Sequence, residues 1–204
     1  MTYSRSGDKT YITLTPAGVF EAFSQTEPSK KQTALQALLS NHETTLVSSW
    51  LNDYSDFWLE EFMEQGWIEE LSICLPAPNL PLDQFLPYVV ASLSGRRRAA
   101  IGSDEGFCLI RVGYSQEEAD MLSVAAADFA DFISRQKQRG WVVESQAISF
   151  FQQVDLLMPE TSFVFFWIEG TGYALIIDGE PLTNNRAFVE LIWALKTVGL
   201  KYAL

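Results

Sequence analysis

The sequence predicts an α+β protein in which a five-stranded antiparallel sheet with helices follows a small, mainly helical domain. Three observations lead to this prediction. Hydrophobic residues make up 48% of the 204 residues, which is enough to build a sizeable core. Three prolines in residues 76–81 interrupt the chain, because proline fits neither a helix interior nor a central strand. Segments with helical and strand periodicity lie on both sides of this interruption.

The proline-rich segment divides the chain into two predicted domains, residues 1–75 and 82–204, with a linker at 76–81. In the first domain, Thr15 and Ser29 are suited to cap helices, and Gly66 to end one. The expected elements are a strand at 11–14, helices that begin at Thr15 and Ser29, a helix at about 45–65 with a break near 52–53, and a strand at 67–75.

The second domain alternates helices and strands. Ser115 and Glu118 form a capping box for a long helix, whose expected apolar face is Met121, Leu122, Ala125, Phe129, Phe132 and Ile133. Residues 103–106 and 169–172 are hairpin turns. The expected elements are a helix at 82–93, strands at 98–103 and 107–112, a helix at 115–139, strands at about 147–157, 162–169 and 173–178, and a helix from 184 or 185 to 199.

The charge balance argues against a nucleic-acid partner. The net charge is −12, and residues 1–80 hold 11 acidic and 4 basic side chains. An acidic protein repels phosphate backbones. The third helix of the first domain carries acidic residues and neither Lys nor Arg. We therefore expect this domain to dock proteins and nucleic-acid binding to be unlikely.

Cysteine usage and hydropathy predict a reduced, cytoplasmic protein. Cys74 and Cys108 lie in different segments and match no metal-binding spacing. Residues 1–11 contain no apolar core of a signal peptide, and no window is apolar for long enough to cross a bilayer. We expect a cytoplasmic location and no membrane span.

No pattern in the sequence predicts catalysis. His42 is the only histidine, and it lies in a polar stretch, so neither a histidine base nor a zinc site is expected. No nucleophile elbow or phosphate-binding loop occurs. We expect no catalytic residue, no metal and no cofactor, and therefore a non-enzymatic protein.

Two groups of residues are candidates for protein interaction. The basic run Arg96, Arg97 and Arg98 could bind an acidic partner, although a solvated turn is the commoner role of such a run. The apolar candidates are Met121, Phe129, Phe132, Phe163, Phe165 and Trp167. The strand that contains Phe163, Phe165 and Trp167 has aromatic residues on both faces, which fits a strand covered on both sides and a dimer surface equally well.

The first domain resembles a winged helix over residues 10–75. "LTPAG" and the later "EEFMEQGWIEE" are similar to the first and last helices of that family. DNA-binding members present a basic third helix. The acidic helix of this chain departs from that pattern, and the resemblance therefore implies a docking module.

The second domain resembles the roadblock (dynein light-chain-like) family, which is related to longin folds, over residues 82–200. The resemblance lies in the element order and in "AAIGSDEGFCLIRVGYSQEEADMLSVAAADFADF", in which Asp104, Gly106 and the helix at 115–132 match the family pattern. It implies a five-stranded sheet with the long helix on one face and a homodimer formed by edge-strand pairing beside that helix. It also implies a role as scaffold or regulator of a small Ras-like GTPase.

Two other functions stay open. A transcription-related protein would use the first domain on DNA and the second to dimerise. A ligand-sensing domain would need an apolar pocket with converging polar groups. The leading hypothesis is a dimeric adaptor that regulates a small GTPase.

Overall fold

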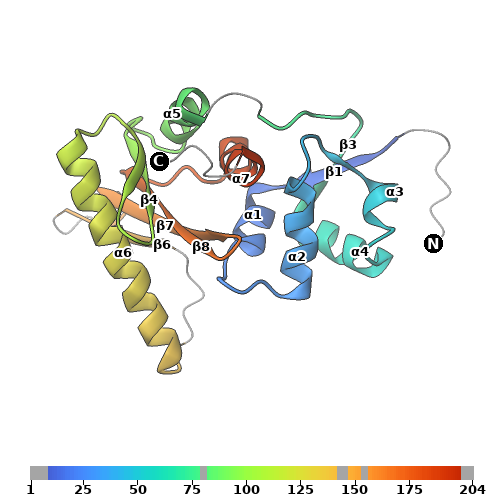
Figure 1. Ribbon diagram of the computed structural model, residues 1–204, viewed down its shortest axis with the longest axis horizontal. Helices are drawn as coiled ribbons and strands as arrows, with labels where there is room; N and C mark the ends of the chain where they lie inside the picture. The colour runs from blue at the N-terminus through green and yellow to red at the C-terminus, as the bar shows by residue number, and fades with distance from the viewer. Residues whose placement is uncertain (1–8, 79–81, 142–146, 153–155, 199–204) are drawn as a thin grey trace.

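The protein folds into two antiparallel sheets with helices packed around and between them (Figure 1). The computed structural model describes residues 9–78, 82–141, 147–152 and 156–198. The first half contains β1 (Tyr11–Leu14), α1 (Pro16–Ala22), α2 (Lys30–Gln36), a 3₁₀ turn η1 (Ala37–Leu39), β2 (Thr45–Leu46), α3 (Val47–Trp50), α4 (Asp56–Glu64) and β3 (Ile68–Leu71). The second half contains α5 (Leu82–Ser92), β4 (Ala99–Ser103), β5 (Cys108–Val112), α6 (Gln116–Gln138), β6 (Ala147–Phe150), β7 (Thr161–Ile168), β8 (Thr171–Asp178) and α7 (Arg186–Val198).

The N-terminal sheet has the order β2-β1-β3. Its helices begin where the capping residues predict. The Thr15 side chain accepts a hydrogen bond from the Gly18 amide, and Ser29 forms a capping box with Gln32. Gly18 is required because a Cβ atom there would lie 1.9 Å from the Trp67 carbonyl oxygen. This close approach packs α1 directly on the chain that enters β3.

The helix predicted at about 45–65 starts two residues later than expected. Residues 45–46 form β2, which pairs with β1, and only α3 and α4 are helical. The break is longer than expected because Ser55 caps α4 as a separate helix by accepting a hydrogen bond from the Trp58 amide. Gly66 ends the segment with φ +67°, as predicted.

The second sheet confirms the predicted five-stranded antiparallel architecture. Its order is β5-β4-β8-β7-β6, which leaves β5 and β6 at the edges. A two-residue turn with positive φ at Glu169 and Gly170 joins the eight-residue strands β7 and β8. The predicted strand at 147–157 is too long. β6 ends at Phe150, and residues 153–155 lie outside the described residues.

Helices cover both faces of the five-stranded sheet (Figure 1). α6 packs on one face, over a core that includes Ala100, Phe163, Phe165 and Ile176. α5 and α7 pack on the other face, which continues into the core of the N-terminal sheet. Proline 87 lies inside α5, and the helix continues through it. The sheet is therefore a middle layer between helices.

The two predicted domains share one hydrophobic core. The Phe20 ring of α1 lies 4.8 Å from the Phe188 ring of α7, centroid to centroid. The Trp193 indole N–H donates to the Asn41 carbonyl, and the Trp167 amide donates to the Phe23 carbonyl. The division into domains 1–75 and 82–204 stays a prediction, but the described parts of both are packed together.

Part of the predicted linker is ordered against the N-terminal half. Ala77 is 5% exposed, and its amide donates to the His42 carbonyl at 2.8 Å. Residues 79–81 of the linker lie outside the described residues. Its first half thus belongs to the packed structure.

Candidate interaction surface

The outward face of α6 exposes large apolar side chains. Met121 is 64% exposed and Phe132 is 44% exposed. Both were assigned from the sequence to the apolar face of the helix and to the interaction candidates. The face that α6 buries is instead the row Ala119, Ser123, Ala126 and Ile133. Small residues in this row let the helix approach the sheet closely, and a Cβ on Gly102 would lie only 3.1 Å from the Ser123 hydroxyl oxygen.

Phe129 connects this helix face with the edge of the sheet. Its ring lies 5.2 Å from the Phe150 ring of β6 and 5.3 Å from the Phe163 ring of β7, centroid to centroid. Phe150 is 45% exposed at the edge strand. We name the surface formed by Met121, Phe129, Phe132 and Phe150 the α6–β6 surface. It joins an apolar helix face to a strand that has one sheet neighbour among the described residues.

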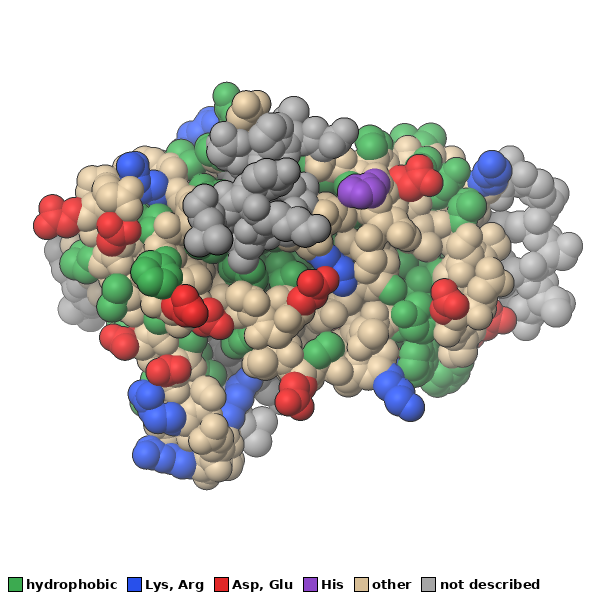
Figure 2. Space-filling view, in the orientation of Figure 1, with side chains coloured by type: hydrophobic (Ala, Val, Ile, Leu, Met, Phe, Trp, Pro, Cys, Tyr) green, Lys and Arg blue, Asp and Glu red, His purple; other side chains and the backbone are tan. Residues whose placement is uncertain are grey.

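The C-terminal end of α6 projects beyond the sheet (Figure 1) and carries aromatic and basic residues. The rings of Phe132 and Trp141 are in edge contact at 6.4 Å. Arg135 and Arg139 are exposed, and the Lys137 ammonium lies 6.0 Å from the centre of the Trp167 ring. Figure 2 shows basic side chains gathered on this projecting end. Trp167 itself is half-buried.

Two of the aromatic candidates are not on the surface. Phe163 and Phe165 are each 2% exposed, because α6 covers this face of β7. Val164 and Phe166, the alternate residues of the strand, are buried in the core on the opposite face. The structure thus shows the strand covered on both sides, which was one of the two interpretations of its aromatic run.

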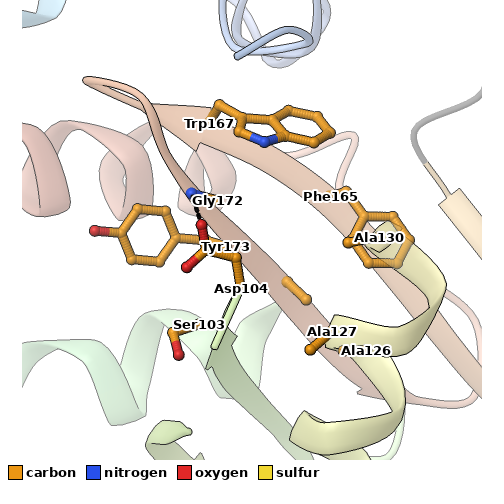
Figure 3. A pocket seen from close by; sticks show the side chains of 10 residues that line it. Ser103, Asp104, Ala126, Ala127, Ala130, Phe165, Trp167, Gly172 and Tyr173 are labelled. Carbon is orange, nitrogen blue, oxygen red and sulfur yellow. Dashed lines mark hydrogen bonds between the residues drawn. The ribbon is translucent and has the colours of Figure 1, made fainter. Parts of the chain in front are cut away.

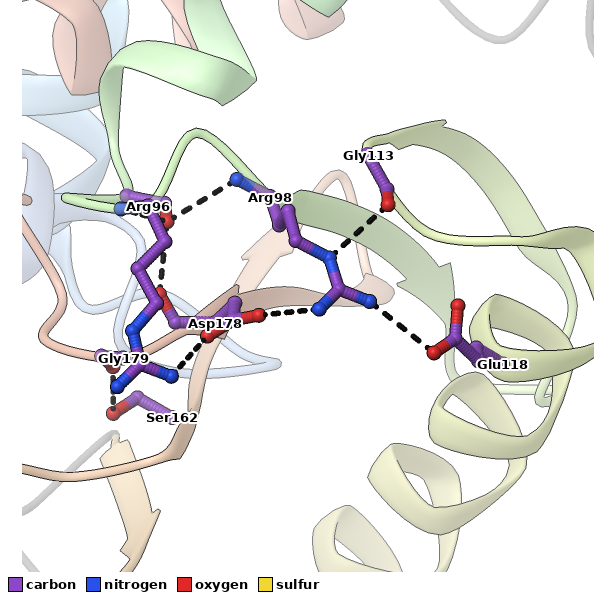
Figure 4. Close-up of polar contacts among 8 residues, drawn as sticks. Arg96, Arg98, Gly113, Glu118, Ser162, Asp178 and Gly179 are labelled. Carbon is purple, nitrogen blue, oxygen red and sulfur yellow. Dashed lines mark hydrogen bonds and ion pairs between the residues drawn. The ribbon is translucent and has the colours of Figure 1, made fainter.

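The basic run forms an ion-pair cluster with Asp178 at the end of β8 (Figure 4). The Asp178 carboxylate, 9% exposed, accepts from Arg96 Nη1 at 2.8 Å and from Arg98 Nη1 at 2.9 Å. Arg98 also donates to the Gly113 carbonyl and contacts Glu118 of α6 at 3.2 Å. Arg97 is exposed in a left-handed conformation with φ 57°. Arg96 and Arg98 therefore connect the segment before β4 to the end of β8, and Arg98 also connects it to α6.

The ion-pair cluster lies beside two groups whose pKa values are shifted, Tyr114 and Glu118. The Arg98 guanidinium lies 4.6 Å from the centre of the Tyr114 ring. Burial, followed by the negative charge of Asp178, raises the pKa of Tyr114 to about 12. The pKa of Glu118 is lowered because its carboxylate accepts the backbone hydrogen bond of the Ser115 capping box. These groups stabilise the beginning of α6.

A small cleft lies between α6 and the β7–β8 hairpin (Figure 3). Ala126, Ala127 and Ala130 form its helix side, and Phe165 and Trp167 form its aromatic side. Asp104 is its one carboxylate, and it already accepts a hydrogen bond from the Gly172 amide at 3.1 Å. The cavity volume of the cleft is about 20 Å³, which is room for about one water molecule. That is below the range of about 300–1,000 Å³ for small-molecule pockets.

His42 is exposed, as its polar setting predicts. In the described ranges, no three His, Cys, Asp or Glu side chains are grouped to hold a metal ion. Of the helices that the structure describes, none combines the length and hydropathy needed to cross a bilayer. No protein-family model, curated protein or solved structure matches this chain.

Proposed function

We propose that the chain is a non-enzymatic, homodimeric adaptor with a roadblock-like second domain that regulates a small Ras-like GTPase. A second copy binds at the α6–β6 surface and extends the five-stranded sheet to ten strands. The observation that carries this proposal is the combination of an edge strand with an exposed apolar helix face beside it. Edge strands tend to pair, and exposed apolar patches mark interfaces.

The topology supports the roadblock-like part of the proposal. The order α5-β4-β5-α6-β6-β7-β8-α7 is the order that the resemblance implies, and α6 covers one face of the sheet. Edge pairing across a two-fold axis is antiparallel and self-complementary. Such pairing through β6 would satisfy outward-facing peptide groups of the strand and bury Phe150 and Phe132.

The N-terminal domain is proposed as a winged-helix-like docking module for proteins. α4 exposes Glu60 and Glu64 and contains no basic residue. Phe57, at the start of this helix, is 69% exposed. An acidic surface with an exposed aromatic ring suits a basic protein partner better than DNA.

Light scattering coupled to size-exclusion chromatography tests the dimer. At micromolar concentration we expect twice the chain mass of 23.0 kDa. Phe132→Glu places a charge in the interface and should give a monomer. Phe57→Glu, which changes an equally large exposed ring outside the α6–β6 surface, should remain dimeric. A wild-type chain that is strictly monomeric would contradict the proposal.

The proposed regulation of a small GTPase is tested separately, by measuring binding of GTPases to the dimer. Purified small Ras-like GTPases from the same genome, loaded with GDP or a GTP analogue, should bind the dimer with an affinity that depends on the nucleotide. Titration calorimetry measures this difference. Equal affinity for both nucleotide states, or no binding by any of them, would remove the regulatory role and leave the dimer unaffected.

A further inference from the structure

The C-terminal end of α6 leaves the body of the protein (Figure 1). Ile133 is the last residue that this helix buries, and from there to Arg139 an α-helix rises about 9 Å. Arg135, Lys137 and Arg139 are exposed, and so is Trp141, which follows the helix. We name these four residues the α6 tip. Because the tip projects from the protein, its surface is convex.

The α6 tip is basic, although the protein as a whole has a net charge of −12. From Gln116 to Ser134 every charged residue of α6 is acidic, whereas the charged residues of the tip are all basic. The ion pair of Arg135 with Asp131, at 3.7 Å, joins two side chains that are more than half exposed. Exposed pairs of this kind contribute little. The tip therefore presents positive charge to an anionic surface.

The backbone fixes the tryptophan of the tip beside the arginines. The Gly140 amide donates to the Lys137 carbonyl and the Trp141 amide to the Gln136 carbonyl, each at 3.0 Å. Gly140 has φ +88°, so the helix ends in a Schellman motif. This motif turns the chain back along the helix, and the Trp141 ring lies in edge contact with the Phe132 ring. The arrangement of the tip is thus built into the end of the helix.

The side chains of the tip combine charge with an amphipathic ring. Arg135 and Arg139 are four residues apart and therefore lie on the same side of the helix. The Trp141 side chain is 56% exposed. An indole ring has an apolar body and a polar N–H, and it favours the boundary between water and an apolar phase. The tip is suited to a surface that offers anionic groups above an apolar layer.

We propose that the α6 tip docks the protein on a membrane surface that contains anionic lipids. The basic side chains bind the negatively charged headgroups, and the Trp141 ring enters the headgroup layer. Lipids rearrange around a convex tip, whereas a folded acidic protein would need a cavity shaped to receive it. A nucleic-acid duplex offers phosphates but keeps its bases stacked, so it has no apolar layer for the indole ring.

The acidic remainder of the protein limits this contact to the tip. At physiological salt the Debye length is about 8 Å, which is close to the length by which the helix end extends. Repulsion between the membrane and the acidic residues of the body is therefore largely screened. The contact is peripheral and reversible, and it does not require the proposed dimer, because a single chain supplies every residue of the tip.

Co-sedimentation with vesicles tests the docking. One set of vesicles contains equal parts of phosphatidylserine and phosphatidylcholine, and the other contains phosphatidylcholine alone. The wild type should bind the first set at low salt, bind it less as the salt concentration rises, and leave the second set unbound. Equal binding to both sets, or binding to neither, would overturn the proposal.

Charge-neutralising variants locate the contact. Arg135→Gln and Arg139→Gln should each lower the partition coefficient on the anionic vesicles about fivefold. Lys30→Gln makes the same change in net charge at an exposed position of α2, so it is the matched control and should bind as the wild type does. Circular dichroism checks that α6 is intact. Arginine variants that bind like the control would contradict a role for the tip.

A label at position 141 tests whether the ring enters the headgroup layer. In a chain with Cys74→Ala and Cys108→Ala, the Trp141→Cys variant carries a polarity-sensitive fluorophore in place of the indole. Its emission should shift to the blue on anionic vesicles. The control is Tyr88→Cys, because Tyr88 is 76% exposed on α5, which packs on the other face of the sheet. No shift at position 141, or equal shifts at both positions, would argue against insertion of the tip.

A labelled DNA duplex separates a lipid surface from phosphates in general. At the salt concentration at which the anionic vesicles bind, the fluorescence anisotropy of the duplex should stay constant when the protein is added. Binding to the duplex that Arg135→Gln weakens would show that the tip recognises a nucleic-acid backbone, and it would overturn the proposed membrane contact.

Discussion

α6 and α7 cover opposite faces of the same sheet but differ in how much of their surface is buried. α7 buries Phe188, Val189 and the whole run from Leu191 to Leu195, because the sheet lies on one side of it and α1 and η1 lie on another. α6 buries a narrow row of mainly small residues and exposes Met121 and Phe132. A helix that is apolar on all sides belongs to a core. A helix with two apolar faces, one buried and one exposed, is expected to bind a partner through the exposed face.

The apolar residues of α7 are covered by the rest of the fold, whereas some of the apolar residues of α6 are exposed. The N-terminal domain already covers the outer side of α7, through contacts such as Phe20 with Phe188. No described element covers the outer side of α6. The apolar residues of α7 should therefore determine the stability of the fold, and those of α6 should determine association.

The largest expected effect comes from removing a ring at the centre of the α7 core. Phe188→Ala should lower the free energy of unfolding by about 4 kcal/mol, because it leaves a cavity against Phe20 and Phe166. Phe132→Ala removes the same number of atoms from α6. At protein concentrations low enough to dissociate a dimer, it should cost less than about 0.5 kcal/mol. Urea unfolding measures both, and equal losses would remove the distinction between the helices.

A smaller effect is expected at the ion-pair cluster that fastens the beginning of α6. Asp178→Asn removes the charge that pairs with Arg96 and Arg98, while both arginines can still reach water. We expect a loss of about 2 kcal/mol in urea unfolding. Glu180→Gln, two residues away and exposed, is the control and should change stability by less than about 0.5 kcal/mol. A loss no larger than that of the control would show that the cluster does not stabilise the fold.

The smallest effect concerns pH. Folded Tyr114 has a pKa of about 12, whereas the ordinary value is 10.0, so the folded protein holds a proton that the unfolded chain loses above pH 10. The stability from this group is present below pH 10 and is lost as pH rises toward 12. At pH 11 the loss is about 1 kcal/mol relative to pH 9.

Urea unfolding at pH 9 and pH 11 measures this difference. Tyr114→Phe should lose less stability over the interval than the wild type does. Tyr88→Phe changes a ring that is 76% exposed, so it should behave like the wild type. Identical pH dependence in all three proteins would contradict the raised pKa of Tyr114.

Much of the fold was predictable because its signals are local. Thr15, Ser29 and Ser115 cap the helices that they were expected to cap, since a side-chain oxygen and a free backbone N–H need only adjacent residues. The hairpins and the order of the C-terminal strands follow from turn residues and alternation for the same reason. β2 was missed because two residues carry no periodicity, and its pairing with β1 is a tertiary contact.

The candidate site was less predictable because exposure depends on packing between distant segments. Met121 and Phe132 have the same apolar character as Ile133, and only the close approach at Ser123 and Gly102 decides which of them faces the sheet. Asp178 and Phe150 were not singled out. Asp178 ends a buried strand, which is a weak signal for an ion pair, and its partners lie about 80 residues earlier. No sequence signal marked Phe150 as part of an edge.

The shared core also has a consequence for folding during synthesis. Phe20 and Phe62 belong to the same core as Phe188, and about 125 residues separate Phe62 from Phe188. At typical translation rates that interval is on the order of ten seconds. During this time the N-terminal sheet and α1 expose the apolar face that α7 covers in the folded protein. A chaperone that shields nascent chains should therefore affect the yield of this protein more than its final stability.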